Sequence, residues 1–395
     1  VFEHFIFMHS FFNLPGFLLF ANAVTASCSA ASDVDSQAVD FGIETHIETI
    51  ATFDEPWAAA FVPGTEIYVV TERNGHAKAI DTKSGEIFIV KGLPSVDYQG
   101  QGGLGDIAFL EQETWDDLTI PRVVYLTWAE AGFEDTRGAA LGMGKFRCVE
   151  SECFVSELRV IWRQSPKVEG NGHYSHRVRI SPEGNYIFIA SGDRRATNLV
   201  QDRNSSIGSI IRLNLDGSPA EGNPFSGSMN TISSQIWTYG HRNILGMAWD
   251  ADQRLWAVEH GPAGGDELNL IKAGQNYGWP IRSYGKQYNG TPITDHSPDD
   301  GFEQPSLHWT PVIAPSDMIF YRGQMFDEWQ NDALITGLSS SALVRVRIDR
   351  ERAVEQARYD FPGRLRSVDE ASDGSIWVLE DGPEARLIKI SRKTL

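Results

Sequence analysis

The residues best suited to chemistry gather in one stretch, residues 236–280. It holds the motif YGHRN (239–243), the loop EHGPAGGDE (259–267) and then NYGWP (276–280). The first motif supplies a guanidinium that keeps its charge, together with an amide. The second offers backbone carbonyls beside carboxylates, and such hard oxygen ligands suit calcium. This combination predicts a site for an anionic, carbonyl-bearing ligand held with a calcium ion.

Four further motifs extend this pattern along the chain: GQGGLGDIAF (100–109), GNGHYSHRVRI (170–180), APSDMIFYRG (314–323) and GRLRSV (363–368). With the stretch 236–280 they resemble the soluble PQQ-dependent sugar dehydrogenases, in particular the bacterial periplasmic aldose sugar dehydrogenases and the soluble quinoprotein glucose dehydrogenases. The motifs follow the order of that family over roughly residues 50–395, which makes chance agreement a poor explanation. The resemblance implies oxidation of an aldose at its C1 hydroxyl to a lactone, with hydride transfer to PQQ, with PQQ and Ca²⁺ as cofactors and with an electron acceptor that the sequence does not identify.

The resemblance assigns the catalytic chemistry to a histidine and an aspartate. His173 lies in a polar loop before an apolar strand, where a histidine is usually only solvated. The matching family histidine is the general base for the anomeric hydroxyl, and a neutral imidazole suits that task. Asp193 follows a strand; it is either an ordinary loop aspartate or, as the resemblance implies, the acceptor that fixes the imidazole tautomer. His176 corresponds to a small residue in the family and ranks below His173.

The resemblance also implies which residues bind the quinone. Arg242 and Asn243 would face its carbonyls, where a fixed cation and an amide stabilise the charge that arriving hydride leaves on oxygen; this makes Arg242 a catalytic residue as well. The amide of Gln101 would bond to the reacting hydroxyl or to the quinone. Arg364 and Arg366 alternate along a strand, share one face and would pair with the carboxylates of PQQ. Without the resemblance, this arginine pair would be interpreted as a surface charge stripe.

Four residues are expected to bind calcium. Gly261 and Pro262 would give backbone carbonyls to an ion bound to PQQ, where the ion acts as a Lewis acid. Glu267, through its side chain, and Tyr277, through its backbone oxygen, match a second, structural calcium of the family. One position departs from the pattern: Ser339 stands where the family has a lysine that contacts PQQ. Losing that cation predicts weaker PQQ binding unless another group compensates.

These loops need rigid elements to hold them, and the sequence predicts strands. Strand–turn–strand units recur six times at intervals of roughly 40–60 residues. Such units bury their faces only against one another, which is typical of a β-propeller. We therefore expect an all-β fold, a six-bladed β-propeller of four-stranded antiparallel blades, that forms a single domain over residues 31–395. Few helices are expected, and the ligand site should lie on the loops of one face.

Composition and charge exclude two classes of partner. The net charge of −19 and the sequence pI near 4.9 argue against nucleic acid and against an anionic membrane surface, because both need a cationic face. Hydrophobic residues at 41% and charged residues at 22% are typical of a globular protein. Self-repulsion at this charge favours a monomer.

Residues 1–30 resemble a secretory signal peptide and are left out of the fold prediction. Residues 5–20 are nearly all apolar but short for a membrane span, and the small-x-small pattern of residues 21–23 follows. The usual cationic start is missing, since the first Lys or Arg is Arg73. Cys28 follows a poor lipoprotein motif, so cleavage is favoured over a lipid anchor. We expect a periplasmic or secreted protein without a membrane span in the mature chain.

The remaining cysteines, Cys148 and Cys153, are close in sequence. In an oxidising compartment they would bridge the tip of a hairpin; otherwise they are two unrelated thiols.

Two other functions stay open on the sequence alone. A propeller of this family that binds a ligand or protein without catalysis is favoured by Ser339. A calcium-dependent lactone hydrolase on a similar propeller needs carboxylate and Asn side chains that converge on one calcium at the axis. The sequence offers carbonyl donors and three arginines instead, which suits an anionic cofactor better. The identity of the sugar is not readable, because the substrate-side loop 283–308 has no recognisable code.

Overall fold

The computed structural model describes residues 39–227 and 231–393 of the 395-residue chain. The predictions for residues 1–30, including the signal-peptide-like segment and Cys28, fall outside the described residues. The described part consists of strands, three 3₁₀ helices and connecting loops. It contains no helix of the length and apolar character that crossing a membrane requires.

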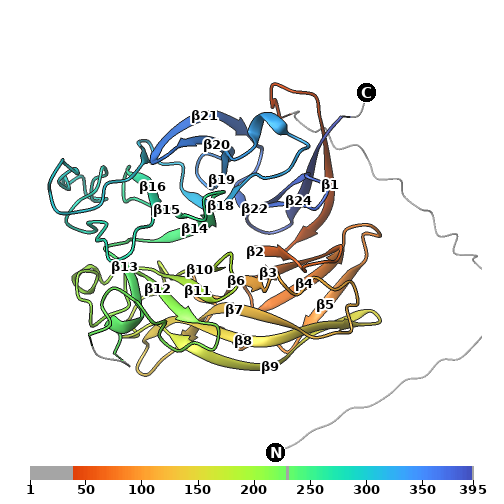
Figure 1. Ribbon diagram of the computed structural model, residues 1–395, viewed down its shortest axis with the longest axis horizontal. Coiled ribbons are helices and arrows are strands. Elements are labelled where there is room, and N and C mark those ends of the chain that lie inside the picture. The colour runs from red at the N-terminus through yellow and green to blue at the C-terminus, as the bar shows by residue number, and fades with distance from the viewer. Residues whose placement is uncertain (1–38, 228–230, 394–395) are drawn as a thin grey trace, which may run out of the picture. The chain divides into compact units, whose positions relative to one another are not determined.

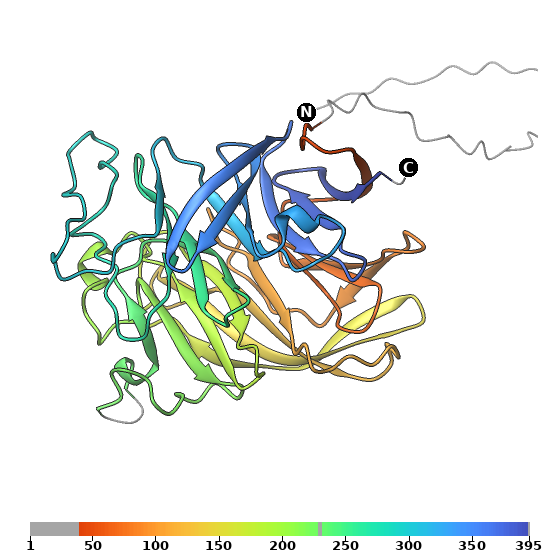
Figure 2. The ribbon, with the colours of Figure 1, turned by 45° about the horizontal axis from the view of Figure 1, so that its top comes forward.

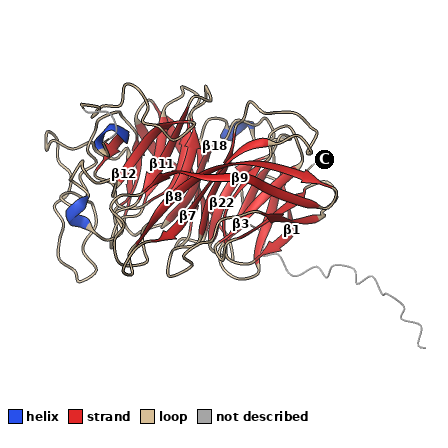
Figure 3. Cartoon of the chain, turned by 90° about the horizontal axis from the view of Figure 1, so that it is seen from below, coloured by secondary structure: helices blue, strands red, loops and turns tan. Residues whose placement is uncertain are grey.

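The strands form six blades of four, as the sequence predicts. In chain order the blades are β2 (Pro56–Phe61), β3 (Ile67–Glu72), β4 (His76–Asp81) and β5 (Ile87–Lys91); β6 (Leu104–Phe109), β7 (Arg122–Ala131), β8 (Arg137–Val149) and β9 (Glu152–Arg163); β10 (Ser175–Ile180), β11 (Tyr186–Ser191), β12 (Ser209–Asn214) and β13 (Ile236–Tyr239); β14 (Ile244–Trp249), β15 (Leu255–Glu259), β16 (Asp266–Leu270) and β17 (Leu307–Trp309); β18 (Pro315–Phe320), β19 (Ala333–Gly337), β20 (Ala342–Asp349) and β21 (Arg352–Asp360); and β22 (Leu365–Glu370), β23 (Ile376–Glu380), β24 (Ala385–Arg392) and β1 (Thr45–Phe53). The 3₁₀ helices are η1 (Thr197–Leu199), η2 (Ser233–Gln235) and η3 (Asp327–Trp329), and they lie in the connecting loops (Figure 3).

The blades close into a ring in two ways (Figure 1). The first described strand, β1, pairs antiparallel with β24, so the two ends of the described chain complete one blade together. The innermost strands β2, β6, β10, β14, β18 and β22 neighbour one another in that order, and β22 neighbours β2 (Figure 2). One feature was not predicted: β5 pairs in parallel with β9, which joins the first two blades into one eight-stranded sheet.

The pattern of side chains explains which strands lie inside. The inner strands β14 and β18 are buried on almost every side chain. The sequence of β14, ILGMAW, is accordingly a continuous apolar run, whereas β18 also carries the buried polar residues Ser316 and Asp317. The outermost strand β21 alternates buried and exposed side chains, because one of its faces meets water. Apolar side chains of adjacent blades pack against each other, as Trp256 of β15 does within the cluster that holds Met318 of β18. The hydrophobic core is thus a set of layers between blades.

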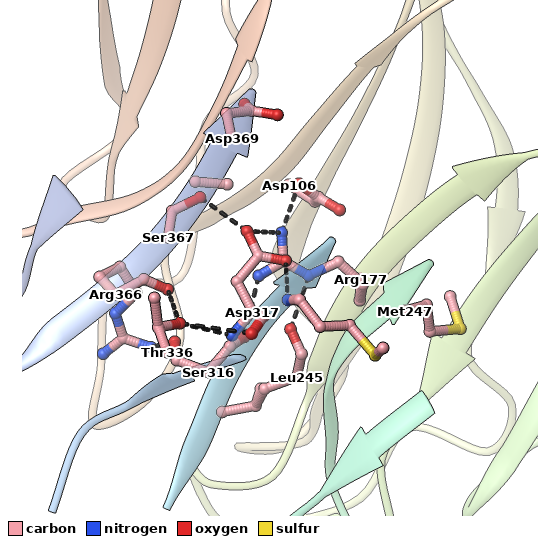
Figure 4. A network of polar contacts seen from close by, with 12 residues as sticks. Asp106, Arg177, Leu245, Met247, Ser316, Asp317, Thr336, Arg366, Ser367 and Asp369 are labelled. Atoms are coloured by element: carbon pink, nitrogen blue, oxygen red, sulfur yellow. Dashed lines mark hydrogen bonds and ion pairs between the residues drawn. The ribbon is translucent and has the colours of Figure 1, made fainter. Parts of the chain in front are cut away.

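A buried ionic network crosses the central channel (Figure 4). Arg177 and Arg179 alternate on β10 and reach Asp106 of β6, each at 3.0 Å. Arg179 also reaches Asp317 of β18 at 3.1 Å, and Ser367 of β22 donates to the same carboxylate at 2.6 Å. Each buried charge has an opposite partner, without which burial would be costly. Both arginines also donate through Nε to carbonyls of β14, Arg177 to Leu245 at 2.6 Å and Arg179 to Met247 at 2.8 Å. Five of the six inner strands are therefore tied together by polar groups.

The two close cysteines are bonded. A disulfide joins Cys148 and Cys153 across the tip of the β8–β9 hairpin. This is the first of the two alternatives that the sequence left open.

Candidate active site

A cavity of about 300 Å³ opens where the inner strands begin. Its volume is at the lower end of the range of about 300–1,000 Å³ that is typical of small-molecule sites. The lining comes from segments far apart in the sequence, which the propeller brings to one mouth of the channel; it includes Gln101, Ser175, Asn243, Ala314, Arg364 and Arg366. A larger cavity of about 480 Å³ lies where the inner strands end, around Asp317 and Asp369, and holds none of the predicted site residues.

His173 and Asp193 meet beside the cavity of about 300 Å³, whose lining includes the three residues that follow His173. Nδ1 of His173 lies 2.7 Å from Oδ1 of Asp193, and both side chains are buried. The indole Nε1 of Trp279 donates to Oδ2 at 2.7 Å, and the backbone N–H of Arg195 donates to Oδ1 at 2.8 Å. Because the carboxylate of Asp193 can only accept a hydrogen bond, the proton of the neutral imidazole lies on Nδ1. Nε2 of His173 has no hydrogen-bond partner within the described residues and keeps its lone pair for a ligand.

The environment keeps His173 neutral. Burial lowers its pKa from the ordinary value, and the charge of Arg242 adds to that decrease. The hydrogen bond and the charge of Asp193 act in the opposite direction but do not outweigh burial. At neutral pH the imidazole is therefore ready to accept a proton.

Gln101 braces the loop that carries His173. The side-chain oxygen of Gln101 accepts from the backbone N–H of His173 at 2.7 Å, and its backbone N–H donates to Asn171 at 2.7 Å. This support matters because the backbone φ angles of His173, Ser175 and His176 are 53°, 63° and 70°, in a region that residues other than glycine rarely adopt. The amide nitrogen of Gln101 has no partner within the described residues and remains available to a ligand.

Arg242 is held from several sides. Its backbone N–H donates to Glu259 at 2.7 Å, and its guanidinium donates to the carbonyl of His260 and to the hydroxyl of Tyr288, both at 3.2 Å. The guanidinium carbon lies 5.3 Å from the centre of the Trp279 ring. The bonds to His260 and Tyr288 use two of the five N–H donors of the guanidinium, and Nε is buried without a partner within the described residues, so donors remain for an anionic ligand.

Asn243, Arg364 and Arg366 all line the cavity. The side-chain oxygen of Asn243 accepts from the backbone N–H of Ser175 at 3.2 Å, which fixes the orientation of its amide. Arg364 and Arg366 flank the start of β22, and both donate through Nε to Asp381, at 2.8 and 2.9 Å. Arg366 is 11% exposed and Arg364 55%, so Arg366 has the more fixed position.

The expected calcium ligands lie in and around the loop after β15. Gly261, Glu267 and Tyr277 line a cavity of about 10 Å³, roughly the size of one water or ion. Burial and the neighbouring Glu259 raise the pKa of Glu267 well above its ordinary value, and a bound cation would reverse that cost. The described residues contain no group of three or more acidic, histidine or cysteine side chains placed for a metal, so backbone carbonyls would complete such a site. Pro262 lies outside this small cavity.

Ser339, which stands where the family has a lysine, and His176, which ranks below His173, lie beside and in the lining of the cavity of about 300 Å³. Ser339 is exposed, follows the lining residue Leu338 and donates to the carbonyl of Val312 at 3.2 Å. His176 is buried in the lining and stacks on Tyr174 with ring centres 5.2 Å apart. Neither nitrogen of His176 has a partner within the described residues, and burial lowers its pKa to about 3.

Several residues of the site were missed in the sequence analysis. His260 and Trp279 lie within the motifs and could have been named by their adjacency to Gly261 and Tyr277. Arg73 adds a further cation to the cavity lining. Asp381 and Tyr288 had no local signal, because each meets its arginine across a long stretch of chain.

The fold and this polar mouth define a six-bladed propeller of the kind found in soluble sugar dehydrogenases. The chain belongs to the glucose/sorbosone dehydrogenase family, whose model matches residues 53–389. This confirms the family that the sequence motifs indicated.

Individual relatives agree with this assignment. The chain is 33% identical to the aldose sugar dehydrogenase YliI of Escherichia coli (strain K12) over 343 residues, which are 86% of this chain and 90% of that protein. The crystal structure of the soluble aldose sugar dehydrogenase of E. coli in its apo form matches with a TM-score of 0.81 at 31% identity, covering 88% of this chain and 100% of that one. The PQQ-bound aldose sugar dehydrogenase of Streptomyces coelicolor matches with a TM-score of 0.71 at 28% identity, covering 88% and 98%.

Proposed function

We propose that this protein oxidises aldose sugars at the C1 hydroxyl to lactones, with PQQ and calcium as cofactors. One observation carries the proposal: Nδ1 of His173 is bonded to Asp193 at 2.7 Å while Nε2 stays free, beside a cavity lined by arginines. The similarity to aldose sugar dehydrogenases, one of them solved with PQQ bound, supports the choice of substrate class and cofactor.

The residues present fit an anionic quinone. Arg364 and Arg366 would hold its carboxylates, and the guanidinium of Arg242 would meet an acceptor oxygen. Asn243 and the free amide nitrogen of Gln101 add neutral donors. When bound, PQQ supplies the acceptor for the hydride that leaves C1.

The proton step falls to His173. Its Nε2 would take the proton of the C1 hydroxyl as the C1 hydrogen departs, because the imidazole is neutral and its tautomer is fixed. Asp193 would then stabilise the imidazolium through the short Nδ1 bond. Arg242, with its fixed positive charge, would stabilise negative charge that develops on the acceptor side.

Calcium would bind at the loop after β15. Gly261 and Pro262 would contribute backbone carbonyls to an ion next to the cofactor, and Glu267 and Tyr277 would hold a second, structural ion. The small cavity shared by Gly261, Glu267 and Tyr277 supports a cation beside the carboxylate of Glu267.

A non-catalytic binding propeller is the second candidate, and Ser339 is the observation that favours it, since a cation is missing there. Arg73 lines the same cavity and supplies a positive charge. The lactone hydrolase is disfavoured because the channel carboxylates Asp106 and Asp317 pair with Arg177 and Arg179 and are not free to converge on a metal. The sugar dehydrogenase therefore remains the better supported function.

We also propose export from the cytoplasm, on the basis of the signal-peptide-like residues 1–30.

The test is reconstitution. The purified protein would receive PQQ and CaCl₂, and oxidation of glucose and other aldoses would be followed with an artificial acceptor dye. We expect dye reduction that requires both additions and is lost in His173→Ala, while His46→Ala, an exposed histidine of β1, keeps full activity. PQQ binding, followed by absorbance, should persist in His173→Ala. PQQ binding to wild type without oxidation of any aldose would favour the binding propeller.

A further inference from the structure

Tyr288 lies at the tip of an ordered hairpin in the long connection between β16 and β17. Gln287 N–H donates to Thr291 at 2.9 Å, and Gly290 N–H donates back to Gln287 at 2.8 Å. At the base, Ala263 and Lys286 exchange two backbone hydrogen bonds of 2.9 and 3.2 Å. The hairpin is therefore anchored to the glycine-rich loop 261–265, and Tyr288 has a defined place at the site.

The hydroxyl of Tyr288 is tied to the reaction centre. It accepts from Nη2 of Arg242 at 3.2 Å, and the guanidinium carbon lies 6.0 Å from the centre of its ring. Arg242 in turn lies over Trp279, which donates to Asp193, the partner of His173. A continuous set of contacts thus leads from Tyr288 to the proposed base.

The ring of Tyr288, by contrast, lies open. Tyr288 is 77% exposed although its hydroxyl is fixed. Because that oxygen accepts from Arg242, its own O–H remains free to donate. Exposed single aromatics on a protein surface need no explanation, but this one combines a fixed end at the site with a free apolar face.

We propose that Tyr288 binds the aldose: its ring stacks on an apolar C–H face of the sugar, and its O–H donates to a sugar hydroxyl. The inference rests on the proposed function. A pyranose presents such C–H faces between its hydroxyls, and a tyrosine offers both an apolar body and a polar tip. Because the contact lies away from the transferred atoms, it contributes to binding more than to the chemical step.

The matched control is Phe133, an aromatic residue that is 80% exposed in the turn between β7 and β8. Its backbone carbonyl accepts from the backbone N–H of Thr136 at 3.1 Å, and its side chain, unlike that of Tyr288, has no hydroxyl to bond Arg242. Both side chains are mostly in water, so neither Tyr288→Ala nor Phe133→Ala should change the melting temperature by more than about 2 °C.

The experiment measures kcat and KM for glucose, and PQQ affinity by absorbance titration, in the PQQ- and Ca²⁺-loaded full chain. We expect Tyr288→Ala to raise KM about tenfold with kcat within about twofold, and Tyr288→Phe, which keeps the ring, to raise KM about threefold. Phe133→Ala should match wild type, and PQQ affinity should stay unchanged in all variants. A wild-type KM in Tyr288→Ala, or a parallel loss of PQQ affinity, would overturn this inference alone. No aldose oxidation by wild type would overturn the proposed function and the inference together.

Discussion

Replacing Asp193 by Asn perturbs the proposed base in a way that the hydrogen-bond geometry defines. Oδ1 of Asp193 accepts from two donors, His173 Nδ1 and Arg195 N–H, whereas Oδ2 accepts from Trp279 Nε1 alone. An amide has only one acceptor oxygen. Placing that oxygen at the Oδ1 position satisfies two donors, and the opposite placement satisfies one. We therefore expect Asp193→Asn to keep the imidazole tautomer and to set its NH₂ against the indole N–H of Trp279.

The expected magnitude follows from the loss of charge. A charge-assisted hydrogen bond is roughly twice as strong as a neutral one, and a bond to a charged group contributes about 1.5–3 kcal/mol. Because the amide still accepts from Nδ1, only the difference between the two kinds of bond, about 0.75–1.5 kcal/mol, should be lost, so kcat/KM should fall about 4–13-fold. A forced change of tautomer would instead lower the rate about 10⁴-fold, the effect known for the corresponding change in a serine-protease triad.

The assay is the pH dependence of kcat/KM for glucose with the loaded enzyme. In wild type the rate should rise with pH through the pKa of His173, which burial places below its ordinary value, and should be level at neutral pH. Removing the charge of Asp193 removes an influence that raises this pKa, so the midpoint in Asp193→Asn should move to lower pH.

Two results would contradict this prediction for Asp193→Asn. A kcat/KM within threefold of wild type would mean that Asp193 does not support the base. A loss near 10⁴-fold without a lower midpoint would mean that the amide turns around and that the count of donors does not decide its orientation. Melting temperature and PQQ binding serve as controls, since Asp193→Asn should bind PQQ normally.

Three further predictions concern the cofactor, the metal and the channel. Arg366→Ala should weaken PQQ binding about 10–100-fold in an absorbance titration, and Arg364→Ala less, because Arg364 is more exposed; equal affinity in both variants and wild type would contradict this. Added CaCl₂ should raise the melting temperature of wild type but not of Glu267→Gln, and EDTA should reverse the effect; an equal rise in the variant would place the ion elsewhere. Burial, and to a smaller extent the negative charge of the nearby Asp317, raises the pKa of Asp369 to about 8, so ionisation of Asp369 destabilises the folded state. This cost is absent below about pH 4 and grows up to about pH 8, so Asp369→Asn should add about 4 kcal/mol of stability at pH 7 and almost nothing at pH 3.5; an equal gain at both values would show that ionisation is not the cause.

The strands and their repetition were predictable because blades are local structures. Alternation in outer strands such as β21 and continuous apolar runs in inner strands such as β14 follow directly from which faces meet water. The parallel pairing of β5 with β9 was not predictable, since it joins two blades at their outer edges without a local pattern.

The site residues likewise divide into those that a local motif predicts and those that no local motif predicts. His173, Arg242 and Gly261 lie in recognisable loops, and the propeller brings those loops to one mouth of the channel. Asp381 and Tyr288 meet arginines that are 15 to 46 residues away in sequence, and neither has a distinctive neighbourhood. Gln101 shows a third case: its motif was noticed, but its bond to the His173 backbone depends on how two loops pack.

The most direct test of the account follows a single turnover without any external acceptor. Protein loaded with PQQ and Ca²⁺ would be mixed with glucose in a stopped-flow instrument, and the absorbance of the bound cofactor recorded for wild type and for His173→Gln. We expect a rapid spectral change in wild type and one slowed at least about 100-fold in His173→Gln, with equal cofactor loading. Equal rates in the two proteins would contradict the assignment of His173 as the base.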